Sequence, residues 1–335
     1  MLPSSEGSLE IVTRCPGCRA DASRPWRRNA WDRLHGVREP TFDYRRCTAC
    51  GLRYLAVRPP KDAVGRWYPP DYHPYVETPS GGTEHLSNHP GTALRAVVSF
   101  LRATTGILER RWPSTLATEL DRFYTPVRDS ARLLDFGCGS ATFLRQAAER
   151  GWQAEGADMS PAVVETVRAA GFEAHIVGDR LWTHTDHEPF DAIRLNHVLE
   201  HLYDPAETLA RLHGALRHGG GLHVAVPNPV SVGACLFRTR WVSLDAPRHV
   251  MLFPQRLLVR LFLEAGFHSV RVVQEVLTKD LSRSLGLLLL DRGRLSRSEA
   301  LTLDQHPLLA TFLQPVAIAA ARFGIADRLH VFAVS

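Results

Sequence analysis

The sequence predicts an α/β protein built on a doubly wound, Rossmann-like sheet of seven strands, preceded by a small cysteine-bearing module. The main observation is a regular alternation of short apolar runs with helical stretches, which indicates a sheet covered by helices on both faces. The 335 residues are 44% hydrophobic and 22% charged. These values are ordinary for a globular chain and exclude a mainly disordered, collagen-like or coiled-coil protein.

Seven short apolar runs are expected to be the strands of this sheet. They span residues 132–136, 152–158, 173–177, 190–195, 222–226, 269–274 and 329–334. Helices are expected at 140–150, 160–171, 204–218 and 254–265, because apolar residues recur there at helical spacing. Ser160 and Asp204 are typical residues for capping the start of a helix. Ligands of such a sheet bind beyond the carboxyl ends of its strands.

Composition divides the chain into three parts. Residues 1–75 form a Cys- and Arg-rich module with a Tyr/Pro-rich connector, 76–130 a linker with a helical segment, and 131–335 the alternating domain. The chain carries a net charge of +5, whereas the stretch from Arg14 to Arg66 has 13 basic and 5 acidic residues. The basic character therefore belongs to the first part.

A helical insert is expected at about 279–327, before the last strand. Its apolar stretch at 306–321 is too short and too interrupted to span a bilayer. It is expected to roof the substrate pocket, form a dimer face or touch a membrane surface, and the sequence does not choose among these. No export signal is recognisable at the start of the chain, so we expect a cytoplasmic protein without a transmembrane segment.

The first predicted strand runs into a glycine-rich turn, Gly137-Cys138-Gly139, and Asp158 ends the second strand. The two glycines let the backbone approach a ligand, and an acidic side chain at Asp158 can accept hydrogen bonds from both hydroxyls of a ribose. A dinucleotide site would have a third glycine where Thr142 stands. A nucleoside site is therefore expected, and an NAD(P)-dependent oxidoreductase is the weaker alternative.

Five ordered segments within residues 131–275 resemble the class I S-adenosylmethionine-dependent methyltransferases. They are LLDFGCGSATFL, AEGADMSP, IVGD, FDAIRLNHVLEHLYDP and LRHGGGLHVAVPN. The resemblance implies that the glycine-rich turn lies against the methionine part of S-adenosylmethionine. It further implies a set of side-chain contacts to this cofactor, from Asp135 to the ammonium, Asp158 to the ribose, Met159 and Asp179 to the adenine, and Asn196 and His197 near the sulfonium.

Two histidines are candidate catalytic bases, because the pKa of an imidazole lies near the working pH. His201 ends the string H-x-x-E-H that begins at His197, and His249 ends an Ala-Pro-Arg-His stretch. On a helix, His197 and His201 would also match a zinc-peptidase pattern, but their place directly after a strand favours the acceptor pocket. The plain alternative is that each histidine only supports its loop. We favour His249 as the base.

Four cysteines form two C-x-x-C pairs, Cys15 with Cys18 and Cys47 with Cys50. Four thiolates suit a tetrahedral structural zinc site with no open position, and the gap between the pairs requires a hairpin. Two disulfides or a redox motif are the alternatives. The surrounding arginines are expected to balance the charge of the zinc cluster or to bind a substrate phosphate.

The stretch RRCTACGLRY, followed by WYPPDY, resembles bacterial methyltransferases that carry an N-terminal zinc ribbon. The resemblance implies a small-molecule acceptor, such as a sugar or natural-product intermediate of secondary metabolism or of cell-surface glycan synthesis. Tyr68, Tyr72 and Tyr75 would fold over that acceptor as a lid. Nucleic acid is not an expected partner. A regulatory binding protein that keeps the fold without methyl transfer is the alternative.

Overall fold

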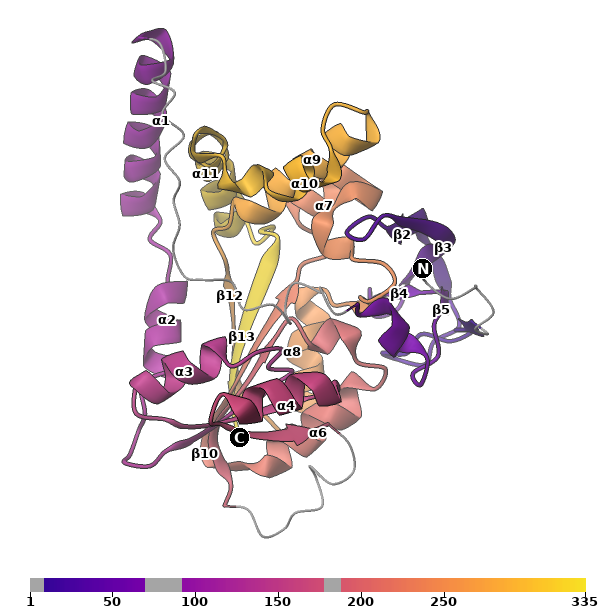
Figure 1. The fold of residues 1–335 in the computed structure, drawn as a ribbon, viewed down its shortest axis with the longest axis vertical. Coiled ribbons are helices and arrows are strands. Elements are labelled where there is room, and N and C mark those ends of the chain that lie inside the picture. The colour runs from indigo at the N-terminus through magenta and orange to yellow at the C-terminus, as the bar shows by residue number, and fades with distance from the viewer. Residues whose placement is uncertain (1–8, 70–91, 178–187) are drawn as a thin grey trace.

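The computed structural model describes residues 9–69, 92–177 and 188–335, and its centre is a seven-stranded sheet (Figure 1). The strand order is β12-β13-β10-β9-β6-β7-β8. The strands are β6 (Arg132–Phe136), β7 (Gln153–Asp158), β8 (Glu173–Ile176), β9 (Phe190–Asn196), β10 (Leu216–Pro227), β12 (His268–Gln274) and β13 (Arg328–Val334). The five neighbouring strands β10, β9, β6, β7 and β8 are parallel. Strand β13 runs antiparallel to both of its neighbours, β10 and β12. All seven expected strands lie in this sheet, which confirms the predicted fold class.

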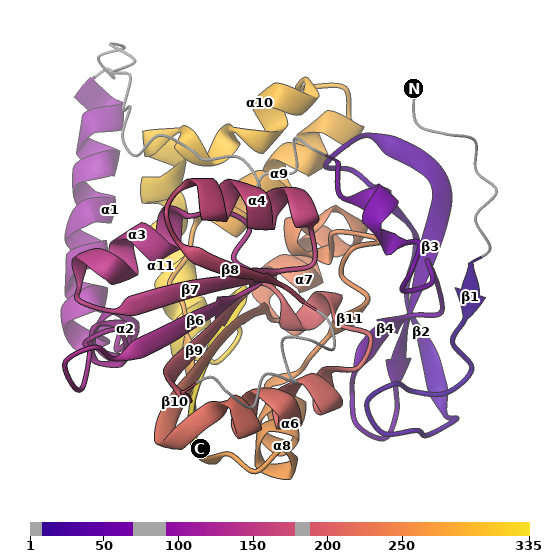
Figure 2. The same ribbon diagram turned by 60° about the horizontal axis from the view of Figure 1, so that its bottom comes forward.

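Helices cover both faces of the sheet. Figure 2 shows α3 (Thr142–Glu149) and α4 (Pro161–Ala169) over one face, with α6 (Pro205–Ala215) and α8 (Gln255–Glu264) over the other. Each helix turns apolar side chains inward, such as the buried Val164 and Val167 of α4. Ser160 and Asp204 cap α4 and α6 as expected, since each side chain accepts a backbone hydrogen bond from the first turn.

The glycine run at residues 219–221 lies inside β10, whereas the sequence placed it before the strand. Helix α6 ends at Ala215, and the pairing of β10 with β9 is irregular between Leu216 and Gly221. Gly220 takes a position where a Cβ would approach the carbonyl oxygen of Arg217 to 2.8 Å. Glycines inside a strand typically mark such bulges and close approaches.

The N-terminal module is a sheet of order β11-β4-β3-β2. The expected hairpin between the cysteine pairs is formed by β2 (Ser23–Asp32) and β3 (Val37–Cys47), followed by β4 (Arg53–Leu55). The edge strand β11 (Met251–Leu252) comes from the second half of the chain. The short pair β1 (Glu10–Ile11) and β5 (Val57–Arg58) lies beside this sheet. The module therefore shares a sheet and a continuous apolar core with the larger domain.

The remaining helices lie before the first strand of the sheet or follow its later strands in the sequence. They are α1 (Thr92–Arg111), α2 (Leu116–Phe123), α7 (Val232–Phe237), α9 (Lys279–Asp291), α10 (Arg297–Leu301) and α11 (Pro307–Arg322). The chain breaks between α1 and α2 near Pro113, and α9 to α11 form the expected insert between β12 and β13. Helix α11 packs against α1, and α9 packs against α7. Among the described residues, no helix is long and apolar enough to cross a membrane.

Candidate active site

The glycine-rich turn closes against the end of the neighbouring strand. Gly137 and Gly139 have φ values of +78° and +63°, which glycine adopts readily. The Gly139 N–H donates to Asp158 Oδ2 at 3.0 Å, and the Ser160 N–H donates to Asp158 Oδ1 at 2.9 Å. A Cβ at Gly137 would lie 2.4 Å from the side chain of Val198. Asp158 thus joins the carboxyl ends of β6 and β7, where the fold places ligands.

Asp135 is fully buried and paired with Arg194. The two residues are register partners on β6 and β9, and Arg194 Nη1 donates to Asp135 Oδ1 at 2.7 Å. Burial raises the pKa of Asp135, and the nearby guanidinium opposes this rise. The sequence interpretation missed this ion pair, although an arginine inside an apolar strand was a signal for it. The contact of Asp135 with the cofactor ammonium stays a prediction.

The other predicted cofactor residues follow the ends of β7 and β9. Met159 is 49% exposed directly after Asp158. Asn196 ends β9, and His197 follows with a φ of +58°. Burial of Cys138, with the carboxylates around it, raises the pKa of its thiol and keeps it neutral. Asp179 lies outside the described residues, as do Tyr72 and Tyr75.

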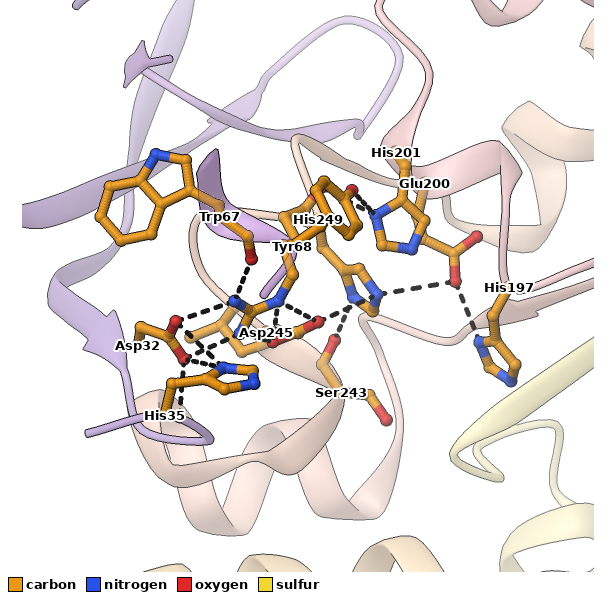
Figure 3. Close-up of polar contacts among 12 residues, drawn as sticks. Asp32, His35, Trp67, Tyr68, His197, Glu200, His201, Ser243, Asp245 and His249 are labelled. Carbon is orange, nitrogen blue, oxygen red and sulfur yellow. Dashed lines mark hydrogen bonds and ion pairs between the residues drawn. The ribbon is translucent and has the colours of Figure 1, made fainter. Parts of the chain in front are cut away.

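His201 and His249 lie in ring contact beside Glu200 (Figure 3). Their ring centroids are 4.7 Å apart. His249 Nδ1 is 2.8 Å from the carbonyl oxygen of Ser243, and its Nε2 is 3.8 Å from Glu200 Oε1. His201 Nδ1 is 3.0 Å from the carbonyl oxygen of Arg248 and 2.8 Å from the Tyr68 hydroxyl. The structure therefore brings together both histidines proposed as bases and one of the three tyrosines proposed as a lid.

Burial and charge set the protonation of this cluster. Burial lowers the pKa of His201 to about 4, and the neighbouring His249 lowers it further in the same direction. Burial of Glu200 would raise its pKa, but His197, whose Nδ1 lies 3.0 Å from Glu200 Oε1, and the other two histidines lower it to about 2. Glu200 Oε2 is buried and has no hydrogen-bond partner within the described ranges of the chain. The cluster thus holds a neutral His201 beside an ionised carboxylate.

The zinc-peptidase arrangement of His197 and His201 is not formed. Leu199–His201 is a 3-10 turn, and His197 precedes it in the left-handed region, so the two histidines do not share a helix face. The atoms of Glu200, His201 and His249 that could ligate a cation do lie within 4.8 Å of one another.

A buried arginine ties the histidine loop to the N-terminal module. Arg248 is fully buried, and its two terminal nitrogens donate to the carboxylate of Asp32 on β2, each at 2.8 Å. Its Nε donates to Asp245 at 3.0 Å, and Nη1 donates to the Trp67 carbonyl oxygen at 2.9 Å (Figure 3). The sequence analysis missed Asp32, because no local pattern pairs a residue with another 216 positions away.

The four cysteines of the two pairs converge on one point. Their sulfur atoms lie within 4.8 Å of one another, with 3.5 Å between Cys15 and Cys50 and between Cys18 and Cys47. All six cysteines of the chain are free thiols. Four sulfurs at this spacing suit a tetrahedral ion with metal–sulfur distances of about 2.3 Å. The disulfide alternative is not formed in this structure.

Comparison with known sequences agrees with the geometry. Residues 108–272, just under half of the chain, match the sequence model of a family described as a methyltransferase domain. The match identifies this part of the chain as a methyltransferase domain. Together with the seven-stranded sheet, the match confirms the family expected from the sequence.

Curated relatives match about a third of the chain. The ubiquinone biosynthesis O-methyltransferase of Xylella fastidiosa (strain 9a5c) is 34% identical over 104 residues, which are 29% of this chain and 42% of the relative. The same-named protein of Xanthomonas oryzae pv. oryzae (strain PXO99A) is 28% identical over 126 residues, 35% of this chain and 53% of the relative. The chain thus spans about half the length of these relatives.

Solved methyltransferases resemble the chain more distantly. A SAM-dependent methyltransferase from Archaeoglobus fulgidus aligns with a TM-score of 0.44 and 17% identity, over 72% of this chain and 94% of that one. An S-adenosylmethionine-dependent methyltransferase from Mesorhizobium loti aligns with a TM-score of 0.42 and 19% identity, over 64% and 95%.

Proposed function

We propose that the protein transfers a methyl group from S-adenosylmethionine to a small-molecule acceptor. The observation that carries this proposal is the turn at Gly137–Gly139, closed by Asp158 at the carboxyl ends of β6 and β7 within a methyltransferase domain. When bound, S-adenosylmethionine supplies an electrophilic methyl group on a sulfonium centre.

The chain offers suitable groups for each part of that cofactor. Each carboxylate oxygen of Asp158 accepts one backbone N–H and keeps a further lone pair, which a ribose hydroxyl can donate to. The exposed Met159 supplies an apolar surface for the adenine, and Asp179 is proposed to meet the adenine amino group. Asp135, Cys138, Asn196 and His197 are proposed to line the methionine and sulfonium end.

His249 is proposed to take the acceptor proton. Its Nδ1–H donates to the Ser243 carbonyl oxygen, so Nε2 carries the free lone pair. When the acceptor oxygen takes the methyl group that the cofactor would supply, its proton would move to Nε2 of His249. The carboxylate of Glu200, 3.8 Å from Nε2, stabilises the resulting imidazolium. His201 is proposed to orient His249 and the Tyr68 hydroxyl.

The names of the relatives support an oxygen atom as the methyl acceptor, since they are called ubiquinone biosynthesis O-methyltransferases. The resemblance of the N-terminal module supports a biosynthetic pathway of a secondary metabolite or a cell-surface glycan. The relatives and the resemblance of the N-terminal module are both compatible with a small-molecule acceptor that carries a hydroxyl group.

Cys15, Cys18, Cys47 and Cys50 are proposed to hold one structural zinc ion. All four ligand positions come from the chain, so the ion has no open site for a substrate. Its proposed task is to fix the two loops that hold the β2–β3 hairpin and β4.

Calorimetric titration with S-adenosylmethionine and its demethylated product tests the cofactor site. We expect micromolar dissociation constants for both, and no tight binding of NADH. Asp158→Ala is expected to weaken binding at least about tenfold, which corresponds to about 1.4 kcal/mol. Tight NADH binding without binding of S-adenosylmethionine would overturn the proposal.

A further inference from the structure

Three arginines stand opposite one another on neighbouring strands of the N-terminal sheet. The strand register pairs Arg24 of β2 with Arg46 of β3, and Arg46 with Arg53 of β4. Directly opposed side chains point to the same face of a sheet, and like charges in these positions repel. The row thus places positive charge side by side where a bound anion would relieve the repulsion.

Arg53 is the most buried member of this row. It is 4% exposed, and its Nη1 donates to the Gly51 carbonyl oxygen at 2.7 Å. Its buried Nε has no hydrogen-bond partner among the residues that the structure describes. Among the described parts of the chain, no carboxylate forms an ion pair with Arg53. Burial lowers its pKa to about 10, and the positive charges of Arg46 and Arg27 act in the same direction. A buried cation without a counter-charge is costly to the fold.

A groove opens beside this row, with a volume of about 590 Å³. Arg46, Arg53 and Arg256 line it, and no aspartate or glutamate is among its lining residues. The volume lies in the range of small-molecule sites, about 300–1,000 Å³.

The first turn of α8 also faces this groove through Gln255 and Arg256. The residue before it, Pro254, offers no side chain to cap the free backbone N–H groups. The N-terminus of a helix attracts anions through these N–H groups and through the helix dipole. The arginines and the helix end thus favour the same kind of ligand.

We propose that this groove binds the phosphate or diphosphate group of a small molecule. Planar guanidinium groups match phosphate oxygens with paired hydrogen bonds, and Arg46, Arg53 and Arg256 all line this groove. The proposal is independent of methyl transfer, since none of Gly137, Asp158 and His249 lines the groove. The groove is nevertheless linked to the histidine loop, because Arg53 is paired with Leu252 of β11, three residues after His249.

Neutralisation of the zinc cluster is the competing explanation of these arginines. A zinc ion with four thiolate ligands carries a net charge of about −2, and Cys50 also lines the groove. If the arginines only balanced that charge, they would bind no further anion, and their loss would weaken zinc retention.

Calorimetry on the full-length, zinc-loaded chain, without S-adenosylmethionine, distinguishes these explanations. We expect pyrophosphate to bind more tightly than inorganic phosphate, and both to weaken as salt is raised. Arg256→Gln and Arg53→Gln are each expected to lower pyrophosphate affinity about tenfold, as the loss of one charged hydrogen-bond partner. Arg260→Gln is the matched control, because Arg260 lies one turn later on α8 and pairs with Glu264.

Arg256 is exposed, so its variant is expected to fold even if the buried Arg53→Gln does not. Two results would overturn the proposal for phosphate. One is no binding of either anion at low salt. The other is an equal loss of affinity in Arg256→Gln and Arg260→Gln, which would show unspecific attraction. A short RNA that binds far more tightly than pyrophosphate would also overturn it, in favour of a nucleic-acid surface.

Discussion

His249 and His201 lie in ring contact, but their surroundings give them different proposed roles. The Nδ1 atom of His249 faces one backbone carbonyl, and its Nε2 faces the buried carboxylate of Glu200. The Nδ1 atom of His201 lies between a carbonyl oxygen and the hydroxyl of Tyr68. The Glu200 carboxylate, 3.8 Å from His249 Nε2, would stabilise the protonated form of His249, whereas His201 is also tied to the Tyr68 hydroxyl.

Replacing His249 by alanine tests this assignment. We expect kcat for a hydroxyl acceptor to fall about 10²–10⁴-fold, because the acceptor proton loses its base, while the affinity for S-adenosylmethionine stays unchanged. Steady-state kinetics and calorimetry measure the two effects. The exposed His268 provides the control, as His268→Ala should keep full turnover.

His201→Ala is expected to disturb folding or cofactor binding as well as turnover, since His201 is tied to Tyr68 and to the backbone of Arg248. If both histidine variants kept full turnover on the true acceptor, a histidine base would not be needed. The acceptor would then be a carboxylate, an amine or an acidic phenol.

Single residues were predictable from sequence where a local pattern defines them. The turn at Gly137–Gly139 and Asp158 have a fixed spacing along the chain, and the structure joins them by a hydrogen bond. The cysteine pairs are equally local, and their sulfurs meet. Asp32 has no such pattern, because its partner Arg248 is brought to it only by the packing of two modules.

At the level of elements, the turn between β6 and α3 is constrained by its backbone conformation and by a close neighbour. Gly137 has a φ of +78°, and Val198, which follows β9, fills the space beside it. The turn therefore depends on glycine for its conformation and also for the close approach of a neighbouring segment.

Gly137→Ala is expected to lower the free energy of unfolding by about 2–3 kcal/mol and to weaken cofactor binding. Two effects destabilise the variant. The added Cβ would lie 2.4 Å from the side chain of Val198, and alanine is strained at a φ of +78°. Gly171→Ala is a matched control, because its φ is +90° and a Cβ there meets nothing within 4 Å. Urea unfolding of both variants separates the cost of the backbone conformation from the cost of the contact with Val198. Equal losses of unfolding free energy in the two variants would contradict the role of Val198.

The cysteine loops are the second element with a direct test. Elemental analysis of the purified protein is expected to find about one zinc ion per chain. Cys47→Ser should release the ion and loosen the hairpin of β2 and β3, because metal binding and folding are coupled in such sites. Cys235→Ser is the control, since Cys235 is an exposed free thiol outside the cluster. A metal-free wild-type protein of full stability would refute the zinc assignment.

The positions of strands and helices could be predicted from the periodicity of the sequence. The sheet that the N-terminal module shares with the larger domain could not. Short apolar runs in the sequence placed all seven strands of the central sheet. The strand β11 is only Met251–Leu252, and it pairs with β4 about 200 residues earlier in the chain. A strand this short has no periodic signal, and its pairing depends on how the two halves dock.

Across the whole molecule, buried polar groups connect distant parts of the central sheet. The hydroxyl of Tyr124 lies 2.6 Å from His223 Nδ1, and His223 Nε2 lies 2.9 Å from His330 Nδ1. His330 Nε2 then lies 3.1 Å from Glu275. If each group donates to the next, the whole chain is satisfied with both imidazoles neutral. Burial raises the pKa of Tyr124, which keeps its proton in place.

This chain of contacts predicts a loss of stability in acid. Burial, with the neighbouring His330 and Arg194, lowers the pKa of His223 well below its ordinary value of 6.5. The unfolded chain therefore takes up a proton near pH 6.5 that the folded protein does not bind. The stabilisation by a neutral His223 is complete above pH 6.5, and it is lost as the pH falls towards the lowered pKa, at up to about 1.4 kcal/mol per pH unit.

Urea unfolding at pH 7, 6 and 5 measures this slope, and His223→Gln is the test variant because glutamine keeps a donor and an acceptor but does not titrate. We expect the variant to be less stable than wild type at pH 7, since it packs less well against Phe332, whose ring stacks on His223. Its stability should nevertheless fall less steeply between pH 7 and 5. His218→Gln, at an exposed position on β10, should keep the wild-type slope. If wild type and His223→Gln lost stability in parallel, other groups would govern the acid sensitivity, and His223 would bind protons equally in the folded and unfolded states over this pH range.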